Sequence, residues 1–297
     1  MDPIRVTVRR GEVVESTHDV HAVAVRDGAV VAEAGDTGRV AFLRSSAKPF
    51  QALPLVRIRA DLTTEEIAIA SASHLASPEQ LAAVRSLLAK APAEVDELEC
   101  GSEPTPLEHN CSGKHAGMLA TCVANGWPLT GYLDPGHPVQ VACQQAIERL
   151  SGERVRQVAV DGCGAPQHAL TLRGLARAYG ALASAGTDNA GRTAAAMRDH
   201  PWHVGGTGRD VTDLMAGIPG LVAKDGAEGV YAAGLPDGSA VALKIDDGAS
   251  RARPPLMVAA LRHLGVSAPV LDQLAVGQVL GGGRPVGEVR VIADALP

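Results

Sequence analysis

The chain has 297 residues, of which 46% are hydrophobic and 20% are charged, a balance that is ordinary for a globular protein with a sizeable core. Its formal net charge of −6 argues against a nucleic-acid partner or an anionic membrane surface. The N-terminal residues lack a basic region followed by an apolar stretch, and no segment approaches the roughly 18 apolar residues of a membrane span, so we expect a cytoplasmic protein.

The predicted elements run from strands through helices and back to strands. Residues 4–44 are predicted to form strands, with a hairpin where Asp27-Gly28 separates two apolar runs. Ser77 and Gln80 form a capping box at the start of a helix. Further helices are expected over 138–150, 167–182, 191–198 and 254–264, and further strands over 155–160 (buried), 229–233, 240–245 and 288–292. Strands at both ends with helices between them predict one α/β domain over 1–297, with a layered fold and a mainly antiparallel sheet built from both ends.

The tetrapeptide Ser45-Ser46-Ala47-Lys48 follows an expected strand and stands at the expected start of a helix. Positions three residues apart share one helical face, and a lysine in a poorly solvated site can lose its proton and act as the base for a serine. Ser-x-x-Lys is the nucleophile motif of the serine β-lactamases and penicillin-binding proteins. A serine before a helix is also a common N-cap, so the tetrapeptide alone does not establish a catalytic site.

Two other residues are candidates for the same chemistry. Ser73 ends an apolar segment and precedes His74, and Lys244 stands in the apolar part of a predicted strand. Each has an ordinary structural explanation, since Ser73 can cap the next element and Lys244 can face water from an edge strand. β-Lactamase-like enzymes place a Lys-Thr-Gly on a strand beside the nucleophile, but here Gly248 follows Lys244 by four residues instead of two.

The five cysteines all lie between Cys100 and Cys163, and an odd count without a secretion signal argues against a disulfide framework. Cys111 stands in a segment that also contains Lys114, and Cys163 stands in a glycine-rich turn after a predicted strand. Thiolates favour zinc, but neither segment has Cys-x-x-Cys spacing, so two buried free cysteines are the alternative.

Taken together, these segments resemble the L-asparaginase II family of the Rhizobium etli inducible type. The matching blocks occur in the family's order over nearly the whole chain, at 44–55, 72–74, 110–119, 161–166, 206–209 and 244–249. The resemblance implies a β-lactamase-like fold that is also related to the serine-dependent glutaminases, and a homodimer. It implies hydrolysis of L-asparagine to L-aspartate and ammonia.

The resemblance also implies roles for individual residues. Ser45 matches the nucleophile and Lys48 its base, while Ser73 and Lys244 match a second serine–lysine pair that contacts the first. Cys111, Lys114 and Cys163 match the ligands of a zinc ion that positions the substrate. Asp161 falls beside that ion, and the other expected substrate-binding residues are Arg44, His115, Gly206 and Thr207.

Two alternatives to an asparaginase stay open. One is a related serine amidohydrolase, such as a glutaminase or a small peptide amidase. The other is a non-catalytic zinc protein that binds an amino acid, in which Ser45 is a helix cap and Lys48 lies on a solvated face. The segment 57–64 is shorter than the family leads us to expect, and residues 229–234 lack a cysteine that some members carry. Both departures affect the expected pocket wall.

Overall fold

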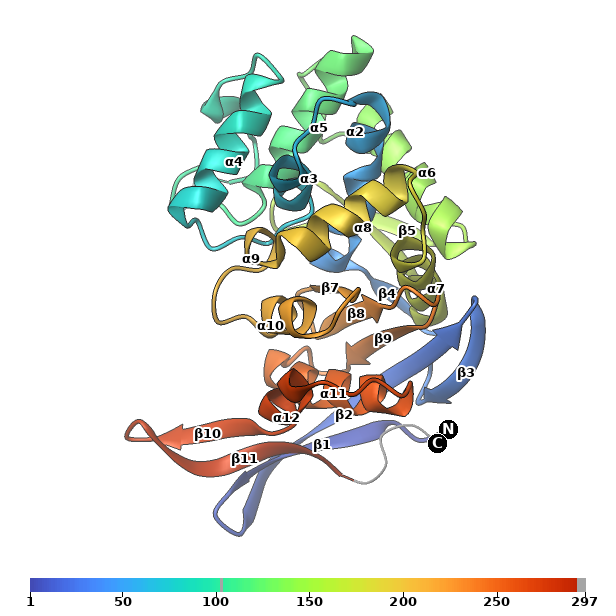
Figure 1. Ribbon diagram of the computed structural model, residues 1–297, viewed down its shortest axis with the longest axis vertical. Helices are drawn as coiled ribbons and strands as arrows, with labels where there is room; N and C mark the ends of the chain where they lie inside the picture. The colour runs from blue at the N-terminus through green and yellow to red at the C-terminus, as the bar shows by residue number, and fades with distance from the viewer. Residues whose placement is uncertain (102–103, 293–297) are drawn as a thin grey trace.

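Strands from both ends of the chain form one antiparallel sheet within residues 1–101 and 104–292, the part that the computed structural model describes (Figure 1). The strand order is β10-β11-β1-β2-β9-β8-β7, and β3 pairs with β2. The strands are β1 (Ile4–Arg10), β2 (Val13–Arg26), β3 (Ala29–Ala34), β7 (Val222–Asp225), β8 (Val230–Gly234), β9 (Ala240–Ile245), β10 (Gly277–Gly281) and β11 (Arg284–Ile292). The predicted α/β class, with an antiparallel sheet from both ends and helices between, is confirmed.

The hairpin between β2 and β3 forms where the sequence predicts it. Asp27 and Gly28 both have positive φ, of 49° and 77°, as the tight turn of a two-residue hairpin requires. The apolar run 20–25 of β2 is fully buried because β2 lies inside the sheet, between β1 and β9. This core places β9 and its neighbours β8 and β7 at fixed positions relative to the N-terminal strands.

Helices gather at the end of the molecule opposite the β1–β2 and β10–β11 ribbons (Figure 1). The helices of this middle region are α1 (Lys48–Gln51), α2 (Leu53–Ile58), α3 (Thr64–Ala70), α4 (Pro78–Ala89), α5 (Ser112–Asn125), α6 (Pro138–Ser151), α7 (Leu172–Ala183), α8 (Asn189–Asp199), α9 (Pro201–Val204) and α10 (Asp210–Gly217). Towards the C-terminus follow α11 (Arg253–His263) and α12 (Pro269–Leu274), and 3-10 turns occur at η1 (Arg44–Ala47), η2 (Val95–Glu97) and η3 (Ser250–Ala252). No helix in the described ranges is long and apolar enough to cross a membrane. The predicted capping box of α4 is confirmed, because Ser77 and Gln80 exchange both capping hydrogen bonds.

A small three-stranded sheet positions two turns that carry expected site residues. Its order is β4-β6-β5, with β4 (Val40–Phe42) and β5 (Gln157–Val160) both antiparallel to β6 (Pro166–Thr171). The two outer strands therefore run in the same direction and end at the same edge of the sheet. The chain after β4 enters η1, and the chain after β5 enters the turn at 161–164, so these two segments meet.

Two predictions about this small sheet are wrong. The helix predicted over 167–182 begins only at Leu172, because residues 166–171 form β6 and the Thr171 side chain caps the helix by accepting from the Gly174 N–H. A short apolar run is compatible with either a strand or a buried helix, and pairing with β4 and β5 selects the strand. The strand predicted over 155–160 is β5, but it is an edge strand whose Val160 side chain is exposed.

Candidate functional site

Ser45 lies in the 3-10 turn η1, which joins β4 to α1. Arg44, directly before it, has a φ of 51°, a left-handed conformation that costs a non-glycine residue about 1–3 kcal/mol and is concentrated at functional sites. The backbone N–H of Lys48 donates to the Ser45 carbonyl, so the two side chains stand one turn apart. Ser45 is partly exposed, whereas Lys48 is buried. The strained turn therefore presents the serine and directs the lysine inward.

The amine of Lys48 reaches three oxygen atoms from other segments. Its Nζ lies 2.6 Å from the Ala72 carbonyl, 3.0 Å from Ser73 Oγ and 3.4 Å from the Asn110 carbonyl. Ser73 follows α3, and its own N–H donates to the Val204 carbonyl at the end of α9. The structure thus brings Ser45, Lys48 and Ser73 into one region, with Lys48 as the link.

The structure does not bring Lys244 to Ser73, so it does not contain the second serine–lysine pair that the resemblance implies. Lys244 lies on β9 opposite His21 of β2, and its Nζ donates to the neighbouring Ile245 carbonyl. Within the described ranges, the lysine that contacts Ser73 is Lys48. Lys244 instead lines a pocket together with Arg44.

A second buried lysine, Lys224, stands close to Lys48 and escaped the sequence reasoning. It lies on β7, which packs against η1, and its side chain is fully buried. Burial lowers the pKa of Lys224 to about 8, with attraction to Asp225 opposing the shift and repulsion from Lys48 adding to it. The segment Lys224-Asp225-Gly226 has the Lys-x-Gly spacing of the β-lactamase strand motif, a signal that would have identified it.

Gly226 allows β7 to approach the turn that carries Ser45. A Cβ at this position would lie 2.9 Å from the Leu43 carbonyl oxygen and 3.2 Å from the Cβ of Arg44. Any larger residue would push the end of β7 away from η1. The glycine of the Lys-x-Gly segment therefore has a packing reason that can be read directly from the structure.

Asp225 holds Lys224 through a buried cluster of charges. Its Oδ1 accepts from Lys224 Nζ at 2.6 Å, and its Oδ2 accepts from Arg209 at 2.6 Å and from Arg253 at 3.2 Å. Burial raises the pKa of Asp225, but attraction to the three cations outweighs burial and holds the pKa below its ordinary value. Arg209 ends the Gly-Thr-Gly-Arg segment at 206–209, so Asp225 ties that segment to β7.

The three expected zinc ligands converge. Lys114 Nζ lies 3.0 Å from Cys163 Sγ, and Cys111, the N-cap of α5, is near enough to Cys163 for the two thiols to shift each other's pKa. Interaction with Cys163 lowers the pKa of the Cys111 thiol well below its ordinary value, whereas interaction with Cys111 raises the pKa of Cys163. All three side chains are buried. Spacing alone did not predict this convergence, because the residues come from α5 and from the turn after β5.

The donor set fits a zinc ion. Two thiolate sulfurs and one amine nitrogen are ligands that zinc accepts, and three protein ligands leave a fourth tetrahedral position open. No group of three or more His, Cys, Asp or Glu side chains that could hold a metal occurs in the part of the chain that the structure describes. The set at Cys111 and Cys163 depends on Lys114 as its third donor, which must be neutral to bind a metal.

Asp161 and Arg44 form an ion pair beside this set. Arg44 Nε donates to Asp161 Oδ1 at 2.9 Å, and Cys163 Sγ lies 3.8 Å from Asp161 Oδ2. The expected substrate residues Arg44 and Asp161 are thus neighbours, at the shared edge of the small sheet. Their placement between η1 and the thiols joins the Ser45 region to the candidate zinc ligands.

His115 is fully buried in α5, and its Nδ1 pairs with the Tyr132 hydroxyl at 2.6 Å. Burial lowers the pKa of His115 well below its ordinary value. Its Nε2 has no hydrogen-bond partner within residues 1–101 and 104–292. The structure therefore places His115 in the helical core, next to Lys114 in the chain, with a neutral ring.

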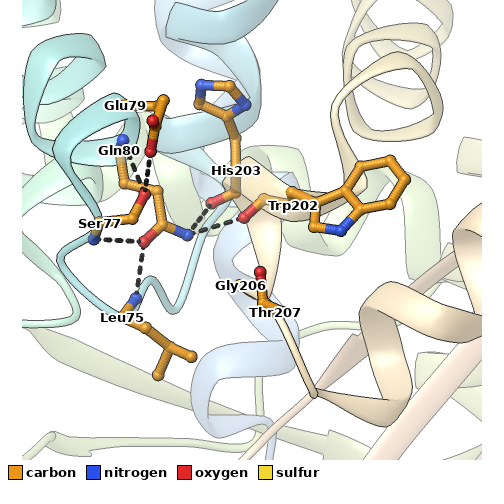
Figure 2. A pocket seen from close by; sticks show the side chains of 8 residues that line it. All are labelled: Leu75, Ser77, Glu79, Gln80, Trp202, His203, Gly206 and Thr207. Atoms are coloured by element: carbon orange, nitrogen blue, oxygen red, sulfur yellow. Dashed lines mark hydrogen bonds between the residues drawn. The ribbon is translucent and has the colours of Figure 1, made fainter.

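Gly206 and Thr207 line a pocket of about 370 Å³, and other residues of its lining come from the segment just after Ser73 (Figure 2). Leu75 and Trp202 form part of its wall, and both are exposed. Gln80 fixes the two sides of the pocket, because its side-chain amide donates to the Trp202 carbonyl and its Oε1 accepts from the Leu75 N–H. These two expected substrate residues thus meet the segment that follows Ser73.

Comparison with known protein families gives a match over nearly the whole chain. The sequence model of a family described as L-asparaginase II matches residues 6–291. Among curated proteins, none matches the chain significantly.

Similar solved structures have low sequence identity. Mglu in its native form is 15% identical, with a TM-score of 0.46 over 78% of this chain and 59% of that one, so the chain spans less than two thirds of Mglu. A beta-lactamase from Mycobacterium bovis is 14% identical, with a TM-score of 0.39 over 78% of this chain and 88% of that one. EstCE1, a hydrolase with promiscuous acyltransferase activity, is 11% identical, with a TM-score of 0.45 over 86% of this chain and 93% of that one.

Proposed function

The chain belongs to the L-asparaginase II family, and we propose that it hydrolyses L-asparagine to L-aspartate and ammonia through an ester on Ser45. Family membership supports an amidohydrolase of the asparaginase type. The observation that carries the proposed mechanism is the contact of 3.0 Å between Lys48 Nζ and Ser73 Oγ, one helical turn from Ser45. It links the proposed base to the proposed proton carrier, and the proposed nucleophile stands one turn before that base in the chain.

In the first step, neutral Lys48 takes the hydroxyl proton of Ser45 while Ser45 Oγ bonds to the carboxamide carbon. The carbonyl electron pair moves onto oxygen, where backbone N–H groups of the η1 turn would stabilise it. A charged lysine has three N–H donors, which match the three oxygen atoms that surround Lys48. A neutral amine keeps two donors and gains a lone pair, so the longest contact, to the Asn110 carbonyl, is the one that it can give up.

In the second step, the C–N bond breaks and ammonia leaves. The leaving nitrogen takes a proton from the Ser73 hydroxyl, which Lys48 reprotonates with the proton it received from Ser45. Water then attacks the ester, Lys48 accepts a proton from that water, and Ser45 Oγ leaves with a proton returned along the same path. L-Aspartate is released, and Lys48 and Ser73 regain their starting protonation states.

Lys224 replaces Lys244 in this proposal as the second lysine near the reacting groups. Its ammonium group is close enough to Lys48 for repulsion to lower the pKa of Lys224. Asp225 pairs directly with Lys224 and opposes the loss of its proton. In this proposal Lys224 is therefore a positioned cation beside Lys48, and Lys48 is the base.

Cys111, Lys114 and Cys163 would hold a zinc ion, which when bound supplies a positive anchor for the charged α-groups of the substrate. Asp161 carries the negative charge that can accept from the substrate ammonium. Arg44 orients this carboxylate through its ion pair of 2.9 Å. These residues therefore bind and orient, whereas Ser45, Lys48 and Ser73 carry the bond changes.

A matched pair of serine variants tests the proposal. Ser45→Ala should abolish ammonia release from L-asparagine, whereas Ser46→Ala, which alters only a buried contact with the Leu43 carbonyl, should retain it. L-Glutamine and an asparagine dipeptide, assayed side by side, separate an asparaginase from a glutaminase or peptide amidase. An active Ser45→Ala protein would contradict the mechanism. The homodimer that the family leads us to expect is tested by light scattering.

A further inference from the structure

We propose that a pocket beside Arg44, whose lining includes neither Ser45 nor Lys48, binds a small organic carboxylate. The pocket has a volume of about 340 Å³, and its lining includes Arg39, Arg44, Glu228 and Lys244. This is near the lower end of the range for small-molecule sites, about 300–1,000 Å³. Its size therefore suits a molecule no larger than an amino acid or a short organic acid.

The pocket has walls from two different sheets. Phe42 comes from β4, and Gln157 and Ala169 lie beside it on β5 and β6, in register across the small sheet. Lys244 comes from β9 of the large sheet. Strand residues are held more precisely than loop residues, so this part of the wall has a fixed position. Arg39, Arg44 and Glu228 come from the segments that flank the strands.

Lys244 is a cation without a carboxylate partner within residues 1–101 and 104–292, and the only hydrogen bond of its Nζ there goes to the Ile245 carbonyl. Burial lowers the pKa of Lys244, the charge of Arg39 lowers it further, and nearby acidic groups oppose the shift. An ammonium group has three N–H donors, so two remain for a ligand. An anion in the pocket would offset the repulsion between Lys244 and Arg39.

The two arginines that line the pocket also have N–H donors that remain available to a ligand. Arg39 uses Nη1 to pair with Asp246, and Arg44 uses Nε to donate to Asp161. Each guanidinium has five N–H donors, and the planar fork suits carboxylates. Glu228, 3.8 Å from Arg44, is the acidic residue of the lining. Both arginines therefore already face a carboxylate, and Lys244 is the cation of the lining that pairs with none among the described residues. A carboxylate on the ligand would supply the missing partner.

The apolar part of the wall argues for an organic anion. Val40, Ala41 and Phe42 of β4 line the pocket, and half of the Val40 surface is exposed. A short hydrocarbon chain can cover these side chains, whereas an inorganic ion such as phosphate cannot. The ligand class that satisfies both the unpaired Lys244 and the wall is therefore a carboxylate with a short carbon body.

L-Aspartate, the product of the proposed reaction, belongs to this class, so the pocket would give the enzyme a second place to hold its product. That consequence rests on the proposed function, whereas the pocket and its charges do not. Succinate is accordingly the better probe. It has the two carboxylates without the amino group, and its binding is measured without any turnover.

Isothermal titration calorimetry of the full chain with succinate tests the site. Wild-type protein should bind succinate more tightly than succinamide, which has the same length and no charge. Lys244→Met should weaken succinate binding by about tenfold or more, the effect of losing one charged hydrogen bond. Lys244→Arg should stay within about threefold of wild type, since it keeps the charge. Lys90→Met, at a distant surface lysine that pairs with Asp61, is the matched control and should bind as wild type does.

Three results would overturn the inference: no binding of succinate to wild type, equal binding of succinate and succinamide, or an unchanged affinity in folded Lys244→Met. The thermal unfolding curve of each variant establishes that it is folded, and Lys244→Gln takes the place of Lys244→Met if the latter unfolds. Loss of asparagine hydrolysis in Ser45→Ala does not bear on this test. A failed pocket and a failed mechanism are therefore distinguishable.

Discussion

Lys48 donates a hydrogen bond from Nζ to Ser73 Oγ at 3.0 Å, between positions 25 residues apart in the chain. Lys48 also begins the helix that follows the strained turn with Ser45. This contact links the local motif Ser-x-x-Lys to a second serine from another segment of the chain.

Ser73→Ala should lower kcat for L-asparagine by about 10²–10⁴-fold with little change in KM, because it removes the proton path to the leaving nitrogen. Steady-state ammonia release measures this effect. Ser71→Ala is the matched control, since Ser71 lies two residues away and its hydroxyl donates only to a helix carbonyl, that of Ile67. Equal losses in the two variants would show that Ser73 has only a structural role.

Lys224→Met should reduce kcat at least about tenfold more than Lys244→Met does, because Lys224 lies beside Lys48 whereas Lys244 faces a separate pocket. Both variants remove one lysine from a strand of the same sheet. The kcat values of the two variants, measured at saturating L-asparagine, test this difference. A greater loss in Lys244→Met would restore the role that the sequence resemblance assigns to Lys244.

Asp225→Asn should move one limb of the pH profile of kcat/KM to lower pH. The negative charge of Asp225 favours protonated Lys224, whose pKa is about 8, so removing that charge lowers the pKa of Lys224. Profiles measured from below to above pH 8 test the shift. The limb that reports Lys224 moves down whether the reaction needs its charged or its neutral form.

The same substitution leaves three cations without their buried carboxylate, so it should also cost about 3–5 kcal/mol of stability. Assays therefore need a temperature at which the variant is folded. Asp213→Asn, at an exposed residue of α10, is the control and should leave the profile unchanged. A destabilised Asp225→Asn with an unshifted profile would mean that Asp225 supports the fold but does not set the protonation of Lys224.

Cys163→Ser should lower the zinc content of the purified protein, because it removes one of three converging donors. Elemental analysis gives the zinc-to-protein ratio independently of activity. Cys143→Ser is a suitable control, since Cys143 is buried and its thiol donates to the Gln51 carbonyl instead of facing the candidate zinc ligands. Full zinc content in Cys163→Ser would exclude the proposed ligand set.

Local patterns in the sequence predict part of this site. Ser45, Lys48 and Ser73 stand in short segments with recognisable residue types, and the structure connects them through Lys48. For the remaining lysine the sequence favours Lys244, which stands inside an apolar run, over Lys224, which is followed by the charged residue Asp225. The partners that make Lys224 a buried cation, Arg209 and Arg253, contact Asp225 from 16 and 28 residues away. No local pattern reveals those contacts.

The same limit of local sequence signals applies to predicting the fold. The hairpin at Asp27-Gly28 and the capping box at Ser77 are predicted correctly because their signals lie within four residues. The strand β6 is predicted wrongly as helix because its identity depends on pairing with β4 and β5. Cys111 and Cys163 likewise meet only because the turn after β5 reaches the first turn of α5.

The most direct test of the central claim is mass spectrometry of the protein quenched with acid during turnover of L-asparagine. The account predicts an aspartyl group on the peptide that contains Ser45, absent from Ser45→Ala and less abundant in Ser73→Ala, because Ser73 protonates the nitrogen that leaves as the ester forms. An adduct on Ser46 or Ser73, or turnover by Ser45→Ala, would contradict it.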